Sequence, residues 1–291
     1  MKLAHLILAH NEPKQLERLI SRLAHPDADI YIHIDKKTSI VPFEYLKNIK
    51  GLFFIQNRVK VYWGSYNMVE ATLNGFKEIL SSGNTYQYLN LLSGQDYPLK
   101  PAAFIHQFLD EQAGKVFMNF LQFDPDWTEA LPRIQQYHFN NWRMQGRYIL
   151  QSIVNKLLPA RRMPNGLIPV GRSQWFTIPI ECVSYLLEYW QHNPKLRRFI
   201  KLTWAPDEFI FQTILYNSNY QSHMVNDDLR YIDWSAGGVS PKTLTIYDTA
   251  ALINSGKLFA RKFDKNTDSA ILDLLDQTIN PDLKAYEHEK Y

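Results

Sequence analysis

Two short stretches hold the residues best suited to chemistry. In residues 93–98 (SGQDYP), a glycine, a carboxylate and a proline directly follow an apolar run. In residues 206–208 (PDE), a proline and two carboxylates precede an apolar helical pattern over residues 209–215. An apolar run that ends in small and polar residues is typical of a buried strand reaching the edge of an α/β sheet, where ligands bind. Together the two stretches indicate a nucleotide-sugar site with a glutamate base.

Glu208 is the preferred base. Pro206 suits the first position of a helix, and the pattern predicts one helix over residues 206–216. In the first turn of that helix, the dipole favours the ionised glutamate that a base requires. The plainer interpretation is that Asp207 and Glu208 only complement the dipole.

Two other carboxylates follow predicted strands. Asp35 ends the run of residues 31–34, where it can reach a base edge or a ribose hydroxyl, although a solvated turn also explains it. Asp96 is unusual so soon after an apolar run unless it caps or binds something, and Gly94 permits close backbone approach. A purely structural loop is the alternative. His33 alternates with isoleucines and is interpreted as a core histidine.

The positive charge that would stabilise a leaving group has two possible sources in the sequence. Lys242 and Lys262 lie near apolar residues, and a lysine pair can neutralise a departing diphosphate, although most lysines are simply solvated. The Asp-x-Asp triplet Asp124–Asp126, which follows an apolar run, offers the oxygen ligands of a divalent cation, but its proline equally predicts a turn. The sequence has no zinc-type His/Cys spacing, Walker loop or G-x-G-x-x-G motif.

The elements that must position these residues alternate between strand and helix. This alternation predicts an α/β fold with a mostly parallel sheet and helices on both faces. With no repeat and no long linker, one domain over residues 1–291 is expected. Strands are predicted at residues 3–9, 30–34, 52–56, 58–62, 86–92, 174–178 and 229–234, and helices at 13–24, 68–81, 102–111, 181–191, 206–216, 249–255 and 269–277.

The middle of the chain is basic. No acidic residue lies between Glu129 and Glu181. Three interpretations remain open: a solvated helical excursion, a site for an anionic or lipid-linked acceptor, and a peripheral membrane contact through residues 133–172, since basic residues interleaved with apolar ones fit interfacial helices. The basic residues there are Arg133, Arg143, Arg147, Lys156, Arg161, Arg162 and Arg172.

Composition excludes several classes. Hydrophobic residues make up 45% of the 291 and charged residues 21%, which argues against disorder. A net charge of +3 is far from that of a nucleic-acid binder. The single cysteine, Cys182, excludes an internal disulfide and favours a reducing compartment. The apolar run at residues 3–9 is too short for a signal peptide or membrane span, so we expect a soluble, cytoplasmic protein.

With these residues assembled, the chain resembles the core-2/I-branching β-1,6-N-acetylglucosaminyltransferase family, which includes peptide O-xylosyltransferases. The match extends over most of the chain and depends on the order and spacing of several modest motifs. These motifs are residues 31–37 (YIHIDKK), 61–65 (VYWGS), 88–99 (YLNLLSGQDYPL), 171–176 (GRSQWF), 206–208 (PDE), 230–234 (RYIDW) and 258–264 (LFARKFD).

The resemblance implies a GT-A-type nucleotide-sugar transferase that works without the usual metal and uses no cofactor. Residues 1–125 form mainly the donor half and residues 126–291 mainly the acceptor half. Glu208 corresponds to the catalytic base, and Lys242 falls where the branching enzymes carry an arginine. The donor-binding residues are then His10, Asp35, Arg58, Trp63, Gly94, Asp96, Lys242 and Lys262, and the acceptor-binding residues Gln174, Trp175, Asp207 and Trp234.

The implied reaction is inverting, metal-independent transfer of a sugar, GlcNAc or xylose, from a UDP-sugar to a glycan or lipid-linked glycan. The animal enzymes carry a membrane anchor and many disulfides; their absence here indicates a bacterial-type cytoplasmic relative, peripheral at the inner face of the membrane. The alternatives are a metal-dependent transferase using Asp124 and Asp126, a glycoside hydrolase pairing Asp96 with Glu208, and a non-catalytic carbohydrate-binding protein.

Overall fold

A mostly parallel sheet forms the centre of the molecule. The computed structural model describes residues 1–142 and 144–279. Within these residues, seven strands form one sheet in the order β3–β2–β1–β4–β7–β6–β8, and only β7 runs against its neighbours. A second sheet has the order β5–β10–β9. The strands are β1 Leu3–Ala9, β2 Ala28–Ile34, β3 Leu52–Phe54, β4 Tyr88–Ser93, β5 Asp96–Pro98, β6 Val116–Gln122, β7 Val170–Pro179, β8 Met224–Asn226, β9 Arg230–Ile232 and β10 Phe259–Arg261.

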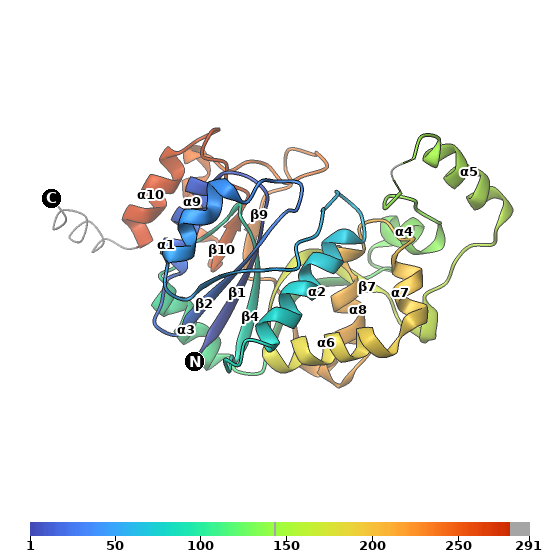
Figure 1. The fold of residues 1–291 in the computed structure, drawn as a ribbon, viewed down its shortest axis with the longest axis horizontal. Coiled ribbons are helices and arrows are strands. Elements are labelled where there is room, and N and C mark those ends of the chain that lie inside the picture. The colour runs from blue at the N-terminus through green and yellow to red at the C-terminus, as the bar shows by residue number, and fades with distance from the viewer. Residues whose placement is uncertain (143, 280–291) are drawn as a thin grey trace.

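Helices cover both faces of the large sheet (Figure 1). The helices pack on two separate clusters of buried residues, one on each face of the sheet. Helices α2, α6 and α8 pack on one face, and α1, α3, α9 and α10 on the other. The α-helices are α1 Pro13–Leu23, α2 Asn67–Leu80, α3 Ala102–Glu111, α4 Leu131–Gln135, α5 Arg147–Leu157, α6 Ile180–His192, α7 Pro194–Ile200, α8 Ile210–Tyr216, α9 Thr249–Asn254 and α10 Ala270–Ile279. The 3₁₀ helices are η1 Val41–Asn48, η2 Thr128–Ala130, η3 Pro164–Gly166, η4 Pro206–Glu208, η5 Asn219–His223 and η6 Ile246–Asp248.

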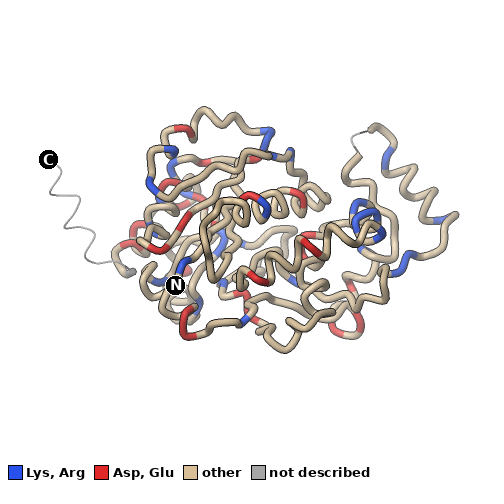
Figure 2. Tube along the Cα trace, turned by 60° about the horizontal axis from the view of Figure 1, so that its bottom comes forward, with Lys and Arg blue, Asp and Glu red and all other residues tan. Residues whose placement is uncertain are grey.

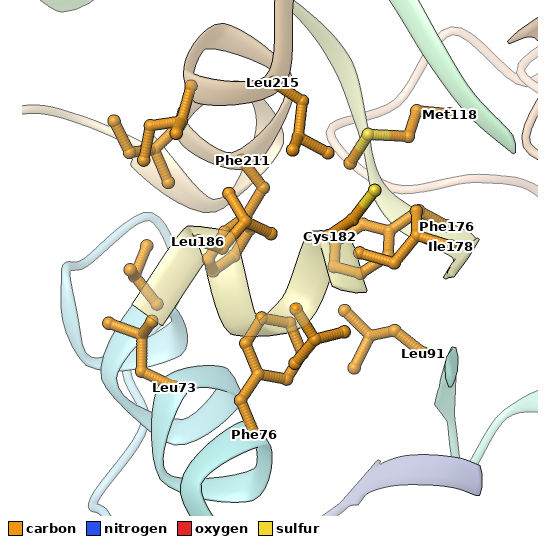
Figure 3. Close-up of a cluster of buried hydrophobic side chains, with 14 of the residues drawn as sticks. Leu73, Phe76, Leu91, Met118, Phe176, Ile178, Cys182, Leu186, Phe211 and Leu215 are labelled. Carbon is orange, nitrogen blue, oxygen red and sulfur yellow. The ribbon is translucent and has the colours of Figure 1, made fainter. Parts of the chain in front are cut away.

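The apolar character of β1 follows from this covering of both faces. All seven residues of β1 are buried, as expected for a central parallel strand. Leu6 and Leu8 join the cluster under α2, whereas Leu3 and Ile7 join the one under α1. Figure 3 shows part of the first cluster, where aromatic rings of α2, β7 and α8 meet with centroids 5.6–6.3 Å apart. The predicted α/β class, with a mostly parallel sheet and helices on both faces, is confirmed.

Two predicted elements are wrong. Residues 58–62 form no strand, because backbone N–H groups of this segment donate to side chains instead of to a neighbouring strand. The Val59 N–H donates to Nε2 of His33 at 3.0 Å and the Val61 N–H to Oδ1 of Asp35 at 3.3 Å. The predicted helix over 206–216 is divided, since Phe209, with φ −147° and ψ −23°, separates η4 from α8. Strands β5, β6, β8 and β10 and helices α4 and α7 were not predicted. In the part of the chain that the structure describes, no helix combines the length and the apolar character needed to cross a membrane.

Candidate active site

The predicted donor residues meet where parallel strands end. His10 follows β1, Asp35 follows β2 and Gly94 follows β4. Backbone hydrogen bonds join these ends: the Asp35 N–H donates to Ala9 at 2.8 Å and the Gly94 N–H to Leu8 at 3.0 Å. A Cβ on Gly94 would lie 3.1 Å from Cβ of Ala9, so glycine allows the loop to cross tightly beside β1. The C-terminal edge of such a sheet is where α/β proteins bind ligands.

Asp35 and Arg58 hold the turn after β2. The buried Asp35 carboxylate accepts from the Lys37 N–H at 2.8 Å and lies 3.3 Å from the Lys37 ammonium. The Arg58 guanidinium donates to the carbonyl groups of Ile34, Asp35 and Thr38 at 2.6–3.0 Å. These bonds give Arg58 a role in holding the turn, and its predicted contact with the donor remains a prediction. Partial burial lowers the pKa of the His10 imidazole, against the charge of Asp35, which raises it.

Asp96 lies beneath the edge. Its side chain is 0% exposed; one oxygen accepts from the Ser93 N–H at 3.1 Å and the other lies 3.5 Å from Nε of Arg261. Burial raises the pKa of Asp96, while the Arg261 charge lowers it. Arg261 also stacks on the buried Trp175, with its guanidinium carbon 4.3 Å from the ring centre. Both residues thus hold Arg261, and the predicted contacts of Asp96 with the donor and of Trp175 with the acceptor remain predictions.

Glu208 lies in η4, a separate turn tied closely to β7. A Cβ on Gly171 would lie 2.3 Å from Cβ of Phe209 and 2.5 Å from the Glu208 carbonyl oxygen, so only a glycine in β7 admits this turn. On the other side, the Ala205 N–H donates to the Gly64 carbonyl at 2.9 Å. The argument that placed Glu208 in the first turn of a long helix is therefore wrong, and tertiary contacts position it instead.

Arg133 is the partner of Glu208. Its Nη1 lies 2.5 Å from Oε2 of Glu208; the Arg133 side chain is 12% exposed and that of Glu208 34%. The guanidinium is sandwiched between the rings of Trp127 and Trp204, with centroids 4.6 Å away on each. The carboxylate is thus oriented by a fixed cation while remaining open to solvent. No local signal identified Arg133, which appeared only as one of seven basic residues of the middle segment.

Asp207 points into the protein. It is 7% exposed, and its Oδ1 has no hydrogen-bond partner within the described residues. Desolvation, followed by the charge of Glu208, raises the pKa of Asp207 to about 7. Asp207 is therefore covered in the structure, and its predicted contact with an acceptor remains a prediction. Gln174, two residues before the β7 segment that pairs with β4, is part-buried, and its Nε2 has no partner in the described part of the chain.

Segment 61–64 connects the two ends of the site. Its first residue, Val61, bonds Asp35, and its last, Gly64, holds the loop before Glu208. Between them, Trp63 is 66% exposed and meets Trp204 edge-on, with centroids 5.5 Å apart. Trp234, 55% exposed, follows β9. Both tryptophans present the flat apolar faces on which sugar rings stack, and their predicted binding roles remain predictions.

The two lysines lie in one loop region after β9 and β10. The Leu244 N–H donates to the Lys262 carbonyl at 2.9 Å, and the Phe263 N–H donates to Gln95 in the β4–β5 loop at 2.9 Å. The Lys262 ammonium donates to the Ser240 hydroxyl at 3.0 Å. Lys242, in contrast, forms an ion pair with Asp248 at 2.6 Å and lies 3.9 Å from Asp233. Of this pair, Lys262 is the better placed to meet an incoming anion.

The Asp-x-Asp triplet forms a turn. Asp124 and Asp126 are both exposed and follow β6. Among the described residues, no group of three or more His, Cys, Asp or Glu side chains is arranged to hold a metal ion. The turn after β6 matches the plainer of the two interpretations of this triplet.

Comparisons with known proteins agree with this set of motifs. The family model of the Core-2/I-Branching enzyme matches residues 3–253. Xylosyltransferase 2 of Rattus norvegicus and of Homo sapiens are each 24% identical over 332 residues, covering 100% of this chain and 36% of theirs. Xylosyltransferase 1 of Rattus norvegicus is 22% identical over 334 residues, covering 38% of its length.

The chain thus spans little more than a third of these relatives. A solved structure, apo mouse xyloside xylosyltransferase 1, aligns over 89% of this chain with a TM-score of 0.37, too low to support an argument. The family match, in contrast, covers most of the chain and includes η4 and the ends of β1, β2 and β4. The chain belongs to the Core-2/I-branching enzyme family.

Proposed function

We propose that this chain is an inverting glycosyltransferase that moves a sugar from a UDP-sugar to a hydroxyl of a glycan acceptor, with Glu208 as the general base. The observation that carries the proposal is the setting of Glu208: the carboxylate is oriented by Arg133, remains 34% exposed, and is joined through segment 61–64 to Asp35 at the sheet edge. Family membership supports sugar transfer as the reaction class.

The chemistry follows from one base and one cation. Glu208 accepts the proton of the acceptor hydroxyl while that oxygen forms a bond to the anomeric carbon. The bond from that carbon to the diphosphate breaks on the opposite face, so an α-linked donor gives a β-glycoside. The electron pair leaves with UDP, whose growing negative charge Lys262 stabilises. Lys242 can assist if its pairing with Asp248 loosens.

Xylose is the first donor to test, because the matched relatives are named xylosyltransferases, and GlcNAc is the second. We propose that Asp35 lies near the uridine and that Trp63 and Trp234 stack on sugar rings. In this mechanism the positive charge comes from protein side chains and no metal is needed. A cation held by Asp124 and Asp126 is the competing source.

The deciding experiment compares wild type with Glu208→Gln, which preserves shape but removes the base. UDP release is measured with and without acceptor, and UDP affinity by calorimetry. We expect turnover to fall by about 10²- to 10⁴-fold with UDP binding nearly unchanged. Glu188→Gln, an exposed glutamate on α6, is the matched control.

The outcomes separate the alternatives. Retention of more than about a tenth of the wild-type rate in Glu208→Gln would refute the assignment of the base. Binding of UDP-sugars by wild type without UDP release, whichever glycan acceptor is offered, would favour a carbohydrate-binding protein. Hydrolysis of a glycan without any UDP-sugar would favour the glycosidase with Asp96 as partner, although Asp96 is buried.

A further inference from the structure

Helix α5 is attached to the protein by its polar side. The Gln151 side chain accepts from the Phe139 N–H at 2.9 Å. One turn later, Asn155 accepts from the Tyr137 N–H at 2.7 Å and donates to the Tyr137 carbonyl at 2.9 Å. Residues four apart lie on one face of a helix, so the face that carries Gln151 and Asn155 is directed at the body of the protein.

The apolar side of α5 therefore faces outward. Ile149, Ile153 and Leu157, again four residues apart, are 68%, 47% and 77% exposed. None of the eleven residues of α5 is buried. Figure 1 shows that α5 and the loops on either side of it form an arm that projects from the rest of the molecule. A surface helix normally turns its apolar stripe inward, so this reversed orientation leaves a stripe that needs a partner.

The surroundings of this stripe are basic. No acidic residue occurs between Glu129 and Glu181, and Figure 2 shows Lys and Arg but no Asp or Glu along the projecting arm. Lys156, within α5, and Arg162, five residues after its end, are both exposed. Further exposed apolar side chains of the arm are Trp142, Met144, Tyr148 and Leu158. Arg143, the remaining basic residue, lies outside the described residues.

We infer that the outward face of α5 docks onto an anionic lipid bilayer, with Ile149, Ile153 and Leu157 entering the headgroup region and the basic residues meeting the lipid phosphates. Apolar residues on one side with Lys and Arg around them are the pattern of helices that lie in a membrane interface. At eleven residues, α5 is about half the length of a membrane-spanning helix, so it lies on the surface.

A bilayer fits this face better than a second copy of the chain. Pairing two copies through the stripe would bring two basic borders together, and like charges at close range oppose association. Anionic phosphates neutralise the same border. The arm is also held rather than loose, because the buried Arg161 donates to the carbonyls of Gln136 at 2.8 Å and Phe199 at 2.5 Å at its base. This docking goes beyond the proposed function and needs no sugar transfer.

The test is co-sedimentation of the full chain with phosphatidylcholine vesicles, with and without phosphatidylglycerol. We expect binding that requires phosphatidylglycerol and weakens with salt. The variant Ile149→Ser/Ile153→Ser/Leu157→Ser is expected to bind at least about tenfold more weakly, since each buried apolar side chain contributes favourably. The matched control is Val41→Ser/Phe53→Ser/Phe104→Ser, which changes three exposed apolar residues away from the arm and should bind as wild type. Lys156→Glu/Arg162→Glu should also weaken binding to the anionic vesicles.

Three results would overturn the inference. One is equal sedimentation with neutral and anionic vesicles. Another is unchanged binding by the α5 variant, whose substitutions are all at exposed positions and leave the core intact. The third is a concentration-dependent dimer without lipid that the α5 variant abolishes, which would make a second copy the occupant. Because binding is read without a sugar donor, these results stand whether or not the proposed transferase activity is found.

Discussion

The Arg133–Glu208 pair gives the sharpest test of how the site operates. In Arg133→Met, Glu208 loses the cation 2.5 Å from Oε2, and the Trp127–Trp204 sandwich loses its guanidinium. A hydrogen bond to a charged group contributes about 1.5–3 kcal/mol. If that contribution orients the carboxylate in the transition state, its loss lowers kcat by about 10- to 150-fold. Because Glu208 is 34% exposed, water replaces part of the interaction, so we expect the lower half of this range.

The assay is UDP release at saturating donor and acceptor, with UDP affinity and thermal unfolding measured on the same variants. Arg133→Lys keeps the charge but loses the planar fork and the stacking, and should fall between wild type and Arg133→Met. Arg172→Met is the matched control, since Arg172 also lies over Trp127, at 5.3 Å, but is exposed. In Glu208→Gln, adding Arg133→Met should change kcat by no more than about twofold, because the two residues act as a unit. A folded Arg133→Met enzyme with kcat within about twofold of wild type would refute the positioning role.

The remaining predictions concern the metal, the leaving group and pH. We expect turnover to survive EDTA because lysine supplies the charge; loss in EDTA with rescue by Mn²⁺ would favour Asp124 and Asp126 instead. We expect Lys262→Ala to weaken the binding of UDP by about 10-fold or more and the binding of uridine by no more than about twofold, both measured by calorimetry. The effect of Lys242→Ala should be smaller, because Asp248 already pairs with Lys242. Equal losses of affinity for UDP and uridine would contradict a contact with the diphosphate. Asp207, whose pKa rises from 3.8 to about 7, keeps in the folded state a proton that the unfolded chain has released, so stability falls as pH rises across that window. In urea unfolding, the free energy of unfolding of wild type should fall by up to about 4 kcal/mol relative to that of Asp207→Asn between pH 4 and pH 7. Parallel pH profiles of the two proteins would show that Asp207 is not buried in its protonated form.

Sequence reasoning located the sheet edge because parallel strands obey a simple rule. Their carboxyl ends lie at the same side of the sheet, so Asp35 and the loop beginning at Gly94 could be placed together without knowing any contact between them. In the structure the two lysines lie in one region for a similar reason, since β9 and β10 are parallel and Lys262 follows β10 directly. The sequence did not predict β10, so it paired the lysines only through their charge and the family resemblance.

Burial was the property that local pattern could not supply. Asp96 and Trp175 occupy motif positions that look available for a ligand, yet both are covered, and their shared contact is Arg261. Whether a carboxylate faces solvent or an internal cation depends on which distant segment packs against it. In this chain that segment is β10, about 165 residues away in sequence from Asp96 and not predicted as a strand.

Glu208 remains the proposed base, but the argument that first placed it is wrong. A helix dipole was invoked to stabilise its charge, but η4 ends at Glu208 and α8 begins only after Phe209. The stabilising charge comes instead from Arg133, 75 residues earlier. The two sources differ physically: a dipole acts on any carboxylate in the turn, whereas a sandwiched guanidinium fixes one oxygen of one carboxylate. That difference explains why the adjacent carboxylates diverge, since Asp207 is buried with an unpartnered oxygen and a raised pKa while Glu208 is paired and open to solvent. This asymmetry between neighbours, which no spacing rule encodes, favours Glu208 over Asp207 as the proposed base, because burial raises the pKa of Asp207 to about 7.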